Sequence, residues 1–495
     1  MLSDLSSLVG IVEKLSAGSI TCVGDVMLDR FFEGQVNRLS PEAPIPVLEV
    51  DSETSMPGGA GNVVRNIAAL GAAARLISVV GNDEPGRSVE DLLAAQDNLS
   101  ARLIFEKNRL TTVKSRYLAA RQQLLRADRE VTSPVTENTS KAIVSAVRKE
   151  ISKRNGVLVL SDYGKGVLGA DLIRILIDIA KQNGTKVIID PKGNFFDIYR
   201  GANLITPNLQ ELSSASGMST KCDSEVVAAA RHIIQNAGVK AVLATRSEQG
   251  MSLVTMEEAT HLKARAREVF DVSGAGDTVV AIVAVALDVG ADLKTAATLA
   301  NIAAGVVVGK NGTAVVHTSE ILSGLHETAL MGSELKISAL SEASNKIASW
   351  REKGLRCGFT NGCFDLLHPG HISLLSQAKE TCDRLIVGLN SDRSVRHLKG
   401  ENRPVQSELS RAQVLASLAD VDLVIIFDDA TPIAVIETLR PDILIKGSDY
   451  ELKDVVGGDL VSKWGGEVFL ADILPGHSTT STIEKLEGNN FCKTN

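Results

Sequence analysis

The chain is poor in aromatic residues and in cysteine, and each shortage argues against a class of protein. Aromatic residues are 3% of its 495 positions, so we expect no stacking platform for single-stranded nucleic acid. A net charge of -8 argues against a general nucleic-acid binder, whose surface would be basic. The six cysteines form no CxxC pair, which favours reduced thiols in a cytoplasmic protein over zinc sites or disulfides.

Long apolar runs and a recognisable leader are also missing. The longest uninterrupted apolar run, VVAIVAVAL, covers nine residues, about half of what a membrane-spanning helix needs. The first residues, MLSDLSSLVGIVEKL, lack the basic start and long apolar core of a secretory signal. We therefore expect a cytoplasmic protein that has no membrane partner.

Short β-rich runs alternate with helical patterns in two separate blocks of the sequence. This alternation predicts an α/β protein in which helices cover both faces of mostly parallel sheets. A polar, weakly helical stretch separates the blocks, so we expect domains at residues 1–330 and 353–495 and a linker at 331–352. Three runs with period-two character, IPVLEV, TTVKSRYLA and QQLLRAD, predict the antiparallel strands of a small lid. The predicted sheet strands are SITCVGD, RLISVVG, GVLVLSD, KVIID, NLITPN and VKAVLAT, then RCGFT, RLIVGLN, VDLVIIF, PDILIKG and EVFLA.

The stretch DVSGAGDTVVAIVAVAL places a small-residue turn before a long apolar helix. Gly274, Ala275 and Gly276 form the turn, and Asp277 follows them. Such a turn directs backbone N–H groups and the positive end of the helix dipole at one spot, which suits a phosphoryl group. Asp277 could accept a hydroxyl proton there, or it could simply cap the helix.

Other polar residues follow predicted strands or glycine-rich turns, where doubly wound sheets bind ligands. Carboxylate and amide groups in such places suit Mg²⁺ with its waters and phosphates. Each group alone could equally be a cap or a turn residue. The residues are Asp25 and Asp29 in GDVMLDR, Asn62 and Asn66 in PGGAGNVVRN, and Asn208 and Glu211 in TPNLQE.

The pair GGAGN and GAGD, about 215 residues apart, resembles the ribokinase-type carbohydrate kinase family over roughly residues 15–325. The resemblance implies a ribokinase-like domain in which Asp277 is the catalytic base and Gly274–Gly276 form the anion hole. It also implies that Glu211 holds Mg²⁺ indirectly, and we expect a homodimer through this domain. The implied sugar-binding residues are Asp29, Asn62, Gly58 and Gly59. The implied ATP-binding residues are Asn208, Leu209, Gln210, Glu211, Thr245, Ser247, Gly250 and Asn301.

In the second block, two histidines flank a Pro-Gly pair in NGCFDLLHPGHISLL. His368 and His371 are three residues apart, and no third ligand with metal spacing follows, so the pattern does not favour zinc. On the first turn of a helix, two imidazoles could instead donate hydrogen bonds to phosphate oxygens as pyrophosphate leaves. Pro369 would fix the start of the helix, and Gly370 would let the backbone approach the phosphates.

This stretch resembles the HxGH motif of the nucleotidyltransferase superfamily, in its cytidylyltransferase-like branch. The resemblance implies a Rossmann-like domain whose catalytic residues are His368, His371 and Lys446. For the lysines and arginine, a solvated surface charge is the alternative interpretation. The implied ATP-binding residues are Asn361, Gly362, Phe364, Asp365, Lys399, Arg403, Ser478, Thr479 and Thr480.

The order of the two halves is similar to a family of bifunctional enzymes of ADP-heptose synthesis, which supplies the lipopolysaccharide core. The resemblance implies ATP-dependent phosphorylation of D-glycero-D-manno-heptose 7-phosphate at C1, giving the 1,7-bisphosphate. It also implies adenylyl transfer from a second ATP to heptose 1-phosphate, giving ADP-heptose and pyrophosphate. Strings such as GDVMLDR, SPEAP, LSDYGKG, DPKG and TRSEQGMSL carry the resemblance.

By this resemblance both halves use ATP and Mg²⁺, and we expect no zinc, flavin or NAD. The expected partners are small molecules, namely heptose phosphates and ATP, and not nucleic acid. Two alternatives remain, the same chemistry on another phosphorylated sugar and a sensor that binds without turnover. The motifs do not assign the cations that hold the 7-phosphate, for which the candidates are Arg30, Arg38, Lys165 and Lys192.

Overall fold

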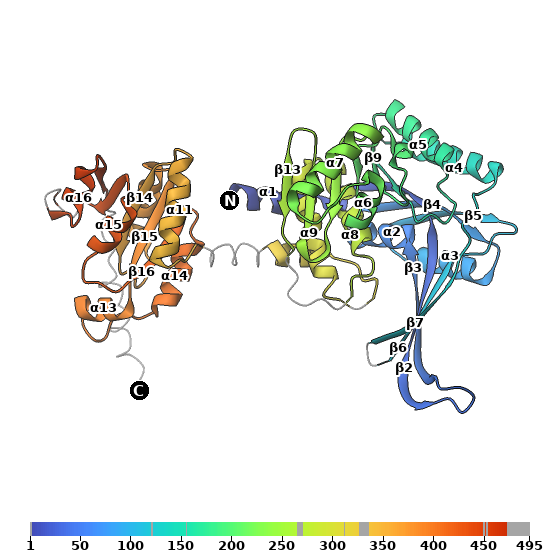
Figure 1. Cartoon of the computed structure of the whole chain (residues 1–495), viewed down its shortest axis with the longest axis horizontal. Helices are drawn as coiled ribbons and strands as arrows, with labels where there is room; N and C mark the ends of the chain where they lie inside the picture. Colours follow the sequence, from blue (N-terminus) through green and yellow to red (C-terminus); the bar gives the residue numbers. More distant parts are fainter. Residues whose placement is uncertain are drawn as a thin grey trace, which may run out of the picture. The chain divides into compact units, whose positions relative to one another are not determined.

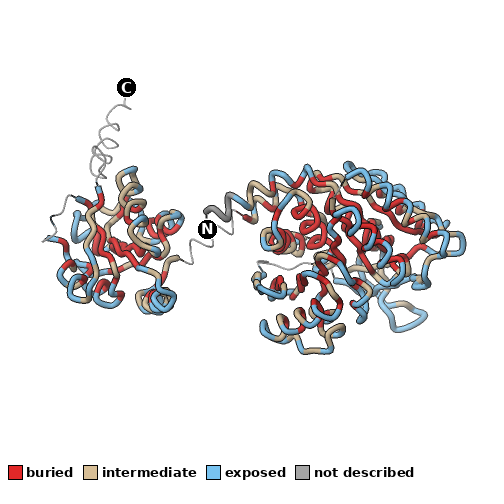
Figure 2. The backbone as a smooth tube through the Cα atoms, turned by 90° about the horizontal axis from the view of Figure 1, so that it is seen from above, coloured by how far each residue is buried: buried red, intermediate tan, exposed pale blue. Residues whose placement is uncertain are grey.

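The computed structural model describes residues 2–119, 122–154, 156–264, 271–310, 312–325, 336–448, 451 and 454–472. They fall into two compact units, Ser3–Leu325 and a C-terminal unit that begins at residue 326 (Figure 1). Each unit has its own hydrophobic cores, and Figure 2 shows the buried residues running through the middle of each. The predicted division into two α/β domains therefore matches two independently cored bodies.

The N-terminal unit is built on a nine-stranded sheet, ordered β13-β12-β11-β10-β9-β8-β1-β4-β5. Seven neighbouring strands are parallel, and β12 and β13 add an antiparallel edge. All six sheet strands predicted for this block are present, whereas β5, β12 and β13 were not predicted. The strands are β1 (Ser19–Gly24), β4 (Ala73–Gly81), β5 (Leu99–Glu106), β8 (Val157–Ser161), β9 (Lys186–Asp190), β10 (Leu204–Ile205), β11 (Val242–Thr245), β12 (Met251–Val254) and β13 (Ala259–Leu262).

Helices cover both faces of this sheet because its strands are apolar on both sides. In β8, Val157 and Val159 join the core on one face, while Leu158 and Leu160 join the core on the other. The first face packs against α2 (Ala60–Ala69), α3 (Glu84–Ala94), α8 (Ala275–Asp288) and α9 (Leu293–Val307). The second packs against α4 (Glu137–Ile151), α5 (Ala170–Gln182), α6 (Leu209–Ser216) and α7 (Asp223–Ala237). Helix α1 (Leu2–Val12) precedes the first strand.

A separate four-stranded sheet, ordered β3-β2-β6-β7, forms the predicted lid (Figure 1), but its central pair, β2 and β6, is parallel and not antiparallel as expected. Its strands are β2 (Val26–Leu39), β3 (Pro46–Gly59), β6 (Val113–Ala119) and β7 (Gln122–Arg129). The sequence predicted β3, β6 and β7 but not β2, whose residues lack strict alternation. The placement of Asp29 at the end of the first strand was wrong, because the chain continues from β1 into the lid and Asp29 lies inside β2.

The C-terminal unit contains a five-stranded, all-parallel sheet ordered β16-β15-β14-β17-β18. Its strands are β14 (Cys357–Gly362), β15 (Arg384–Asn390), β16 (Leu423–Phe427), β17 (Ile443–Gly447) and β18 (Glu467–Ala471), and all five were predicted. The strand order reverses at β14, and ligands bind at such a switch point in open α/β sheets. The helices are α12 (Pro369–Glu380), α13 (Asp392–Lys399), α14 (Glu408–Ser417), α15 (Ile433–Leu439) and α16 (Gly458–Lys463).

The range 331–352, expected to be a linker, contains helix α11 (Leu340–Glu352). Its buried residues Ala343 and Ile347 belong to a core of the C-terminal unit, together with Phe359 of β14. The compact C-terminal unit thus begins before residue 353, because a mostly polar helix needs only a narrow apolar stripe to pack.

Two further sequence expectations concern membranes and cysteines. None of the helices among the described residues is both long and apolar enough to cross a bilayer. Five of the six cysteines lie in the described part of the chain, and all five have free thiols. Cys492 lies outside the described residues.

Candidate functional site

The first candidate site centres on Asp277, in the first turn of α8. Helix α8 is capped by Gly274 in a left-handed conformation (φ 79°), and the Asp277 side chain is buried. Each carboxylate oxygen accepts a hydrogen bond, Oδ1 from the Tyr163 hydroxyl (2.5 Å) and Oδ2 from the Asn62 amide (2.8 Å).

The electrostatics of this carboxyl suit a proton acceptor. Burial raises the pKa of Asp277 to about 6, while the hydrogen bonds from Tyr163 and Asn62 oppose the rise. The carboxyl is therefore mostly ionised at neutral pH, with a pKa close enough to the working pH for effective general-base catalysis. Tyr163 was not singled out from the sequence, although it stands in the quoted string LSDYGKG.

Asp25 positions Tyr163. Its carboxylate accepts backbone N–H hydrogen bonds from Tyr163, Lys165 and Val167, each 3.0 Å long. Asp25 thus holds the loop that follows β8 in place. A buried carboxylate with three backbone donors is a structural anchor for that loop.

Asn66 holds Asn62, the second hydrogen-bond donor to Asp277, in place. Its side-chain amide donates to the backbone oxygen of Asn62 (3.0 Å), and its own oxygen accepts from the Thr278 hydroxyl (3.1 Å). The two asparagines, one helical turn apart, therefore tie α2 to α8.

The predicted sugar-binding residues lie at the base of the lid. Asp29 is buried and forms an ion pair with Arg116 of β6 (2.7 Å). A Cβ at Gly58 would lie 2.1 Å from an Asp29 carboxylate oxygen, and Gly59 has a positive φ (60°), so both positions need glycine. The structure brings Asp29, Gly58 and Gly59 together.

Two cations beside Asp29 were missed. Lys114 and Arg116 stand two residues apart on β6 and so point to the same face of the lid. Burial lowers the pKa of Lys114, and the charge of Asp29 opposes this. Both lie in the alternating run TTVKSRYLA, whose spacing places their side chains on one face of the strand.

The four cations suggested for the 7-phosphate all have acidic partners. Arg30 pairs with Glu84 at 2.8 Å and Arg38 with Glu49 at 3.5 Å. Lys165 pairs with Glu130, and Lys192 pairs with Glu211 at 2.9 Å. A phosphate would have to compete with these carboxylates.

On the side predicted to bind the nucleotide, four of the predicted residues line one cavity of about 190 Å³, namely Asn208, Glu211, Thr245 and Gly276. Asn208 and Glu211 form a reciprocal capping box at the start of α6. The cavity is also lined by Asp162, Tyr163, Asp190, Pro191, Lys192 and Thr206. It therefore joins the start of α8 to the carboxyl ends of β8, β9 and β11.

The other predicted nucleotide residues do not line this cavity. Leu209 and Gln210 lie in the first turn of α6. Ser247 and Gly250 belong to a turn in which both have positive φ, and Asn301 of α9 donates to the Lys263 backbone oxygen (2.8 Å). These residues shape the neighbouring loops in the structure.

The second candidate site lies where β14 gives way to α12. His368 is the N-cap of α12 and Pro369 its first residue, as the sequence predicted. The His368 and His371 rings are stacked with centroids 3.8 Å apart, and Phe364 packs against His371 at 5.0 Å. Burial, and then the neighbouring His368, lower the pKa of His371 to about 4. His371 is therefore neutral at pH 7 and can donate only one ring N–H.

Asp365 organises the loop opposite these histidines. It is buried and accepts hydrogen bonds from the Arg403 side chain (2.5 Å) and from the backbone N–H of Val405 (2.7 Å). Lys446, at the end of β17, donates to the backbone oxygen of Asn361 (3.3 Å). The predicted residues Asn361, Gly362, Asp365, Arg403 and Lys446 thus surround one strand end.

Arg411 is a further buried residue that the sequence analysis missed. The residue is 1% exposed, and its guanidinium donates to the backbone oxygens of Cys363 (2.6 Å) and Asn390 (2.9 Å) and to the Asp392 carboxylate (2.6 Å). It therefore fixes the loops after β14 and β15. Lys399 ends α13, whereas Ser478, Thr479 and Thr480 lie outside the described residues.

Comparisons with known proteins agree with this division. The pfkB family carbohydrate kinase model matches residues 17–319, and the cytidylyltransferase-like model matches residues 359–467. *Escherichia coli* phosphofructokinase-2 in complex with potassium shares the fold, with a TM-score of 0.53 and 21% identity over 63% of this chain and 98% of its own. The protein is thus a carbohydrate kinase joined to a nucleotidyltransferase.

Full-length relatives narrow the assignment. The bifunctional protein HldE of *Paramagnetospirillum magneticum* is 55% identical over 99% of this chain and 100% of its own. That of *Rhodospirillum rubrum* is 52% identical over 97% of each chain. The chain belongs to the HldE family of bifunctional proteins. It is an enzyme with heptose-phosphate kinase and adenylyltransferase activities.

Two glycines at the start of α8 should respond differently to the same substitution. Gly274→Ala puts a Cβ 2.5 Å from the Asn62 amide at a positive φ, so it should destabilise the kinase unit by about 1 kcal/mol or more. At Gly276 a Cβ meets nothing within 4 Å but enters the nucleotide cavity. Gly276→Ala should change stability by less than about 0.5 kcal/mol yet lower kinase kcat/KM. Thermal unfolding and a kinase assay on both variants check this. A wild-type kcat/KM in Gly276→Ala would contradict the prediction that the phosphates bind at the start of α8.

Proposed function

We propose that the two reactions of ADP-heptose synthesis take place at the two sites described above. The N-terminal site phosphorylates D-glycero-D-manno-heptose 7-phosphate at C1 with ATP. The C-terminal site joins heptose 1-phosphate to the AMP part of a second ATP. The observation that carries the first assignment is the buried Asp277 carboxylate, whose neighbour Gly276 and hydrogen-bond donor Tyr163 line a cavity together with acidic and hydroxyl groups.

In the kinase reaction, Asp277 accepts the proton of the C1 hydroxyl. The C1 oxygen bonds to the γ-phosphorus of ATP, the bond from that phosphorus to the bridging oxygen breaks, and ADP leaves. Of the predicted anion-hole residues, Ala275 donates its backbone N–H to the Val272 oxygen (3.3 Å), so the Gly276 N–H and the positive end of the α8 dipole are left for the transferred group, where negative charge is spread over its oxygens. Asn62 and Tyr163 keep the carboxylate oriented through the reaction.

Mg²⁺ fits the acidic wall of the nucleotide cavity. The pKa of Asp190 lies well above its ordinary value because of burial and the charges of Asp277 and Glu211, so a cation nearby would offset unfavourable negative charge. Among the described residues no three His, Cys, Asp or Glu side chains form a metal cluster. Asp190 and Glu211 would therefore hold the ion together with ATP phosphates and water, as is usual for Mg²⁺. When bound, the ion neutralises charge on the phosphates.

Lys114 and Arg116 are further candidates for holding the 7-phosphate, although Arg116, like the earlier candidates, is already paired with a carboxylate. They flank Asp29 at the base of the lid, and Lys114 is near enough to Asp277 for its charge to lower the pKa of that carboxyl. Charge-assisted hydrogen bonds to a phosphate contribute about 1.5–3 kcal/mol each. Such contacts would favour the phosphorylated sugar over the free one.

In the adenylyltransferase reaction, a phosphate oxygen of heptose 1-phosphate bonds to the α-phosphorus of ATP and pyrophosphate leaves. The rings of His368 and His371 lie beside the phosphates and donate hydrogen bonds to the oxygens whose charge grows as the bond breaks. Lys446, Lys399 and Arg403 add positive charge around the strand end. Because the kinase product still carries its 7-phosphate, a separate phosphatase must act between the two reactions.

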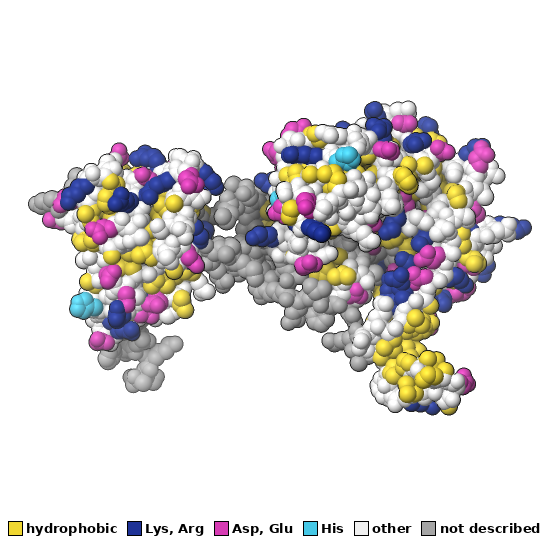
Figure 3. Space-filling model, in the orientation of Figure 1, with side chains coloured by type: hydrophobic (Ala, Val, Ile, Leu, Met, Phe, Trp, Pro, Cys, Tyr) yellow, Lys and Arg dark blue, Asp and Glu magenta, His cyan; other side chains and the backbone are white. Residues whose placement is uncertain are grey.

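We further place the enzyme in the cytoplasm and propose that two copies pair through their lids. The lid exposes the large apolar side chains Leu39 (66%), Ile45 (56%), Val50 (50%) and Leu125 (59%), and Figure 3 shows hydrophobic side chains gathered there. Its outer strands, β3 and β7, also present sheet edges, which are ready surfaces for pairing.

The two sites should fail separately. Asp277→Asn should lower kinase turnover by about 10²–10⁴-fold, the range for a lost general base, while adenylyl transfer from supplied heptose 1-phosphate persists. His371→Ala should do the reverse, with a loss of about 10²–10³ in adenylyl transfer. Separate assays of ADP and pyrophosphate measure both reactions. Loss of both activities in a folded single variant would contradict the assignment.

The pH profile of the kinase should depend on Tyr163. Asp277 acts in its ionised form, so activity should rise with pH through a pKa of about 6. Tyr163→Phe removes a hydrogen bond that stabilises the carboxylate. The pKa below which kinase activity falls should therefore rise by roughly one pH unit. Tyr117→Phe, in the lid ring that stacks on Phe32, is the matched control and should leave the profile in place. An unshifted profile in Tyr163→Phe would mean that Tyr163 does not tune the base.

The proposed dimer can be tested by sedimentation velocity. The wild-type protein should sediment as a dimer, and the double variant Leu39→Glu/Ile45→Glu should sediment as a monomer because charges would be buried in the contact. A control, Phe195→Glu, changes a side chain that is 81% exposed and outside the lid. A monomeric wild type, or a lid variant that remains dimeric, would contradict the proposal.

A further inference from the structure

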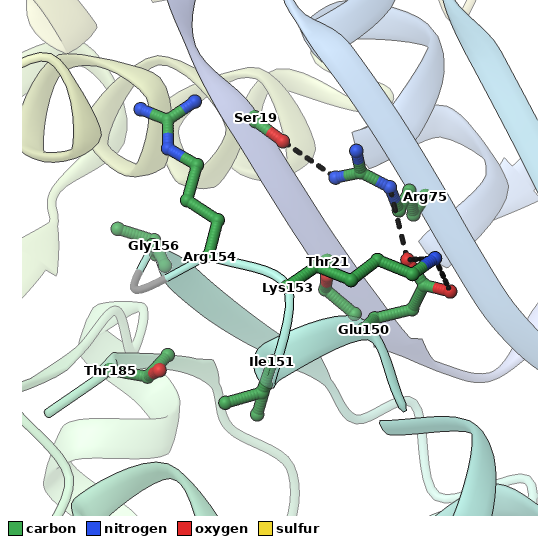
Figure 4. Close-up of a pocket in the computed structure, with 10 residues that line it drawn as sticks. Ser19, Thr21, Arg75, Glu150, Ile151, Lys153, Arg154, Gly156 and Thr185 are labelled. Carbon is green, nitrogen blue, oxygen red and sulfur yellow. Dashed lines mark hydrogen bonds and ion pairs between the residues drawn. The ribbon is translucent and has the colours of Figure 1, made fainter. Parts of the chain in front are cut away.

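A second cavity lies at the other edge of the kinase sheet. It has a volume of about 190 Å³ and is lined by residues from the first positions of β1 and β8 and from the end of α4 (Figure 4). The strands β4, β1, β8 and β9 run parallel, so their amino ends meet here and their carboxyl ends meet at the catalytic site. The six residues of β1 separate the two edges by roughly 20 Å. The cavity is therefore not part of the site described above.

We propose that this cavity is a second ligand site, which binds the phosphate group of a small anion. One observation is an unsatisfied hydroxyl. Thr185, just before β9, is 7% exposed, and its hydroxyl has no hydrogen-bond partner among the described residues. Buried hydroxyls in folded proteins nearly always have a hydrogen-bond partner, so the Thr185 hydroxyl has hydrogen-bonding capacity left for a ligand.

The second observation is the charge of the lining. Three cations, Arg75, Lys153 and Arg154, face a single lining carboxylate, Glu150. Figure 4 shows the guanidinium groups of Arg75 and Arg154 on either side of Ser19. Guanidinium groups bind phosphate oxygens with matched, charge-assisted hydrogen bonds.

The cations are held in place by their existing partners. Arg75 donates to the Ser19 hydroxyl (2.6 Å) and pairs with Glu150 (3.2 Å), which also accepts from Lys153 (2.7 Å). Arg154 pairs with Asp288 at the end of α8 (3.2 Å). Since one carboxylate serves both Arg75 and Lys153, the lining keeps a positive surplus for a ligand.

The size of the cavity limits what it takes. Sites that enclose a whole drug-sized molecule are about 300–1,000 Å³, so this cavity, like the nucleotide cavity of the same volume, encloses a phosphate group and leaves the rest of a larger ligand outside. Two sources of that group fit, free inorganic phosphate and the phosphate end of a larger phosphorylated molecule whose remainder stays in solvent. The same residues recognise both.

Hydrogen-exchange mass spectrometry on the full-length protein separates this site from the catalytic ones by position. Inorganic phosphate in one arm and ribose 5-phosphate in the other should slow exchange in peptides covering residues 148–158 and 181–187. Lys153→Gln should raise the half-saturating anion concentration about tenfold, and Thr185→Val should raise it severalfold. Lys149→Gln, the same charge change at an exposed residue of α4 outside the cavity, should have no effect.

The two arms identify the source of the phosphate group. Equal half-saturation by both anions indicates a site for free phosphate, and tighter binding of ribose 5-phosphate indicates a site for a phosphorylated organic molecule. Absence of protection in these peptides with either anion would overturn the proposal. Equal weakening by Lys149→Gln and Lys153→Gln would also overturn it, because the effect would then be general screening.

Discussion

The kinase half depends on keeping one buried carboxyl ionised. Burial alone raises the pKa of Asp277, and an isolated buried carboxyl would take up a proton. Hydrogen bonds from Tyr163 and Asn62 oppose this, and they come from two segments far away in the chain. The carboxyl can therefore act as a base only when the loop after β8 and the start of α2 are both in place.

Much of the surrounding structure serves this requirement. Asp25 holds the loop that carries Tyr163, Asn66 holds the helix that carries Asn62, and Gly58 and Gly59 let the lid return closely beside Asp29. In the C-terminal half a side chain is kept uncharged instead, because burial and the neighbouring His368 lower the pKa of His371 to about 4. The same physical effect, desolvation, thus shapes a base in one site and a neutral donor in the other.

The sequence predicted the strands of both sheets well because buried parallel strands are short apolar runs between turns. It also located Asp277, which follows the positive-φ Gly274, and His368 and His371, which flank the Pro-Gly start of α12. Strand β2 was missed because its charged residues break the alternation, and Asp29 was misplaced with it.

Residues that act through tertiary contacts were not predictable from local pattern. Tyr163 and Arg411 have no distinguishing neighbours, and their roles exist only because distant segments meet. Asp25 was grouped with ligand-binding residues, whereas its oxygens accept backbone hydrogen bonds from the loop after β8. Spacing reports which groups lie on one element, but the fold decides which of them face each other.

The central claim is that one chain carries two separate ATP-dependent reactions. Purified full-length protein, supplied with ATP and Mg²⁺, is given heptose 7-phosphate in one reaction and heptose 1-phosphate in another. ADP and pyrophosphate are quantified in each. The account predicts ADP without pyrophosphate from the 7-phosphate and pyrophosphate without ADP from the 1-phosphate. Pyrophosphate from the 7-phosphate alone, or ADP as the only product in both reactions, would contradict it.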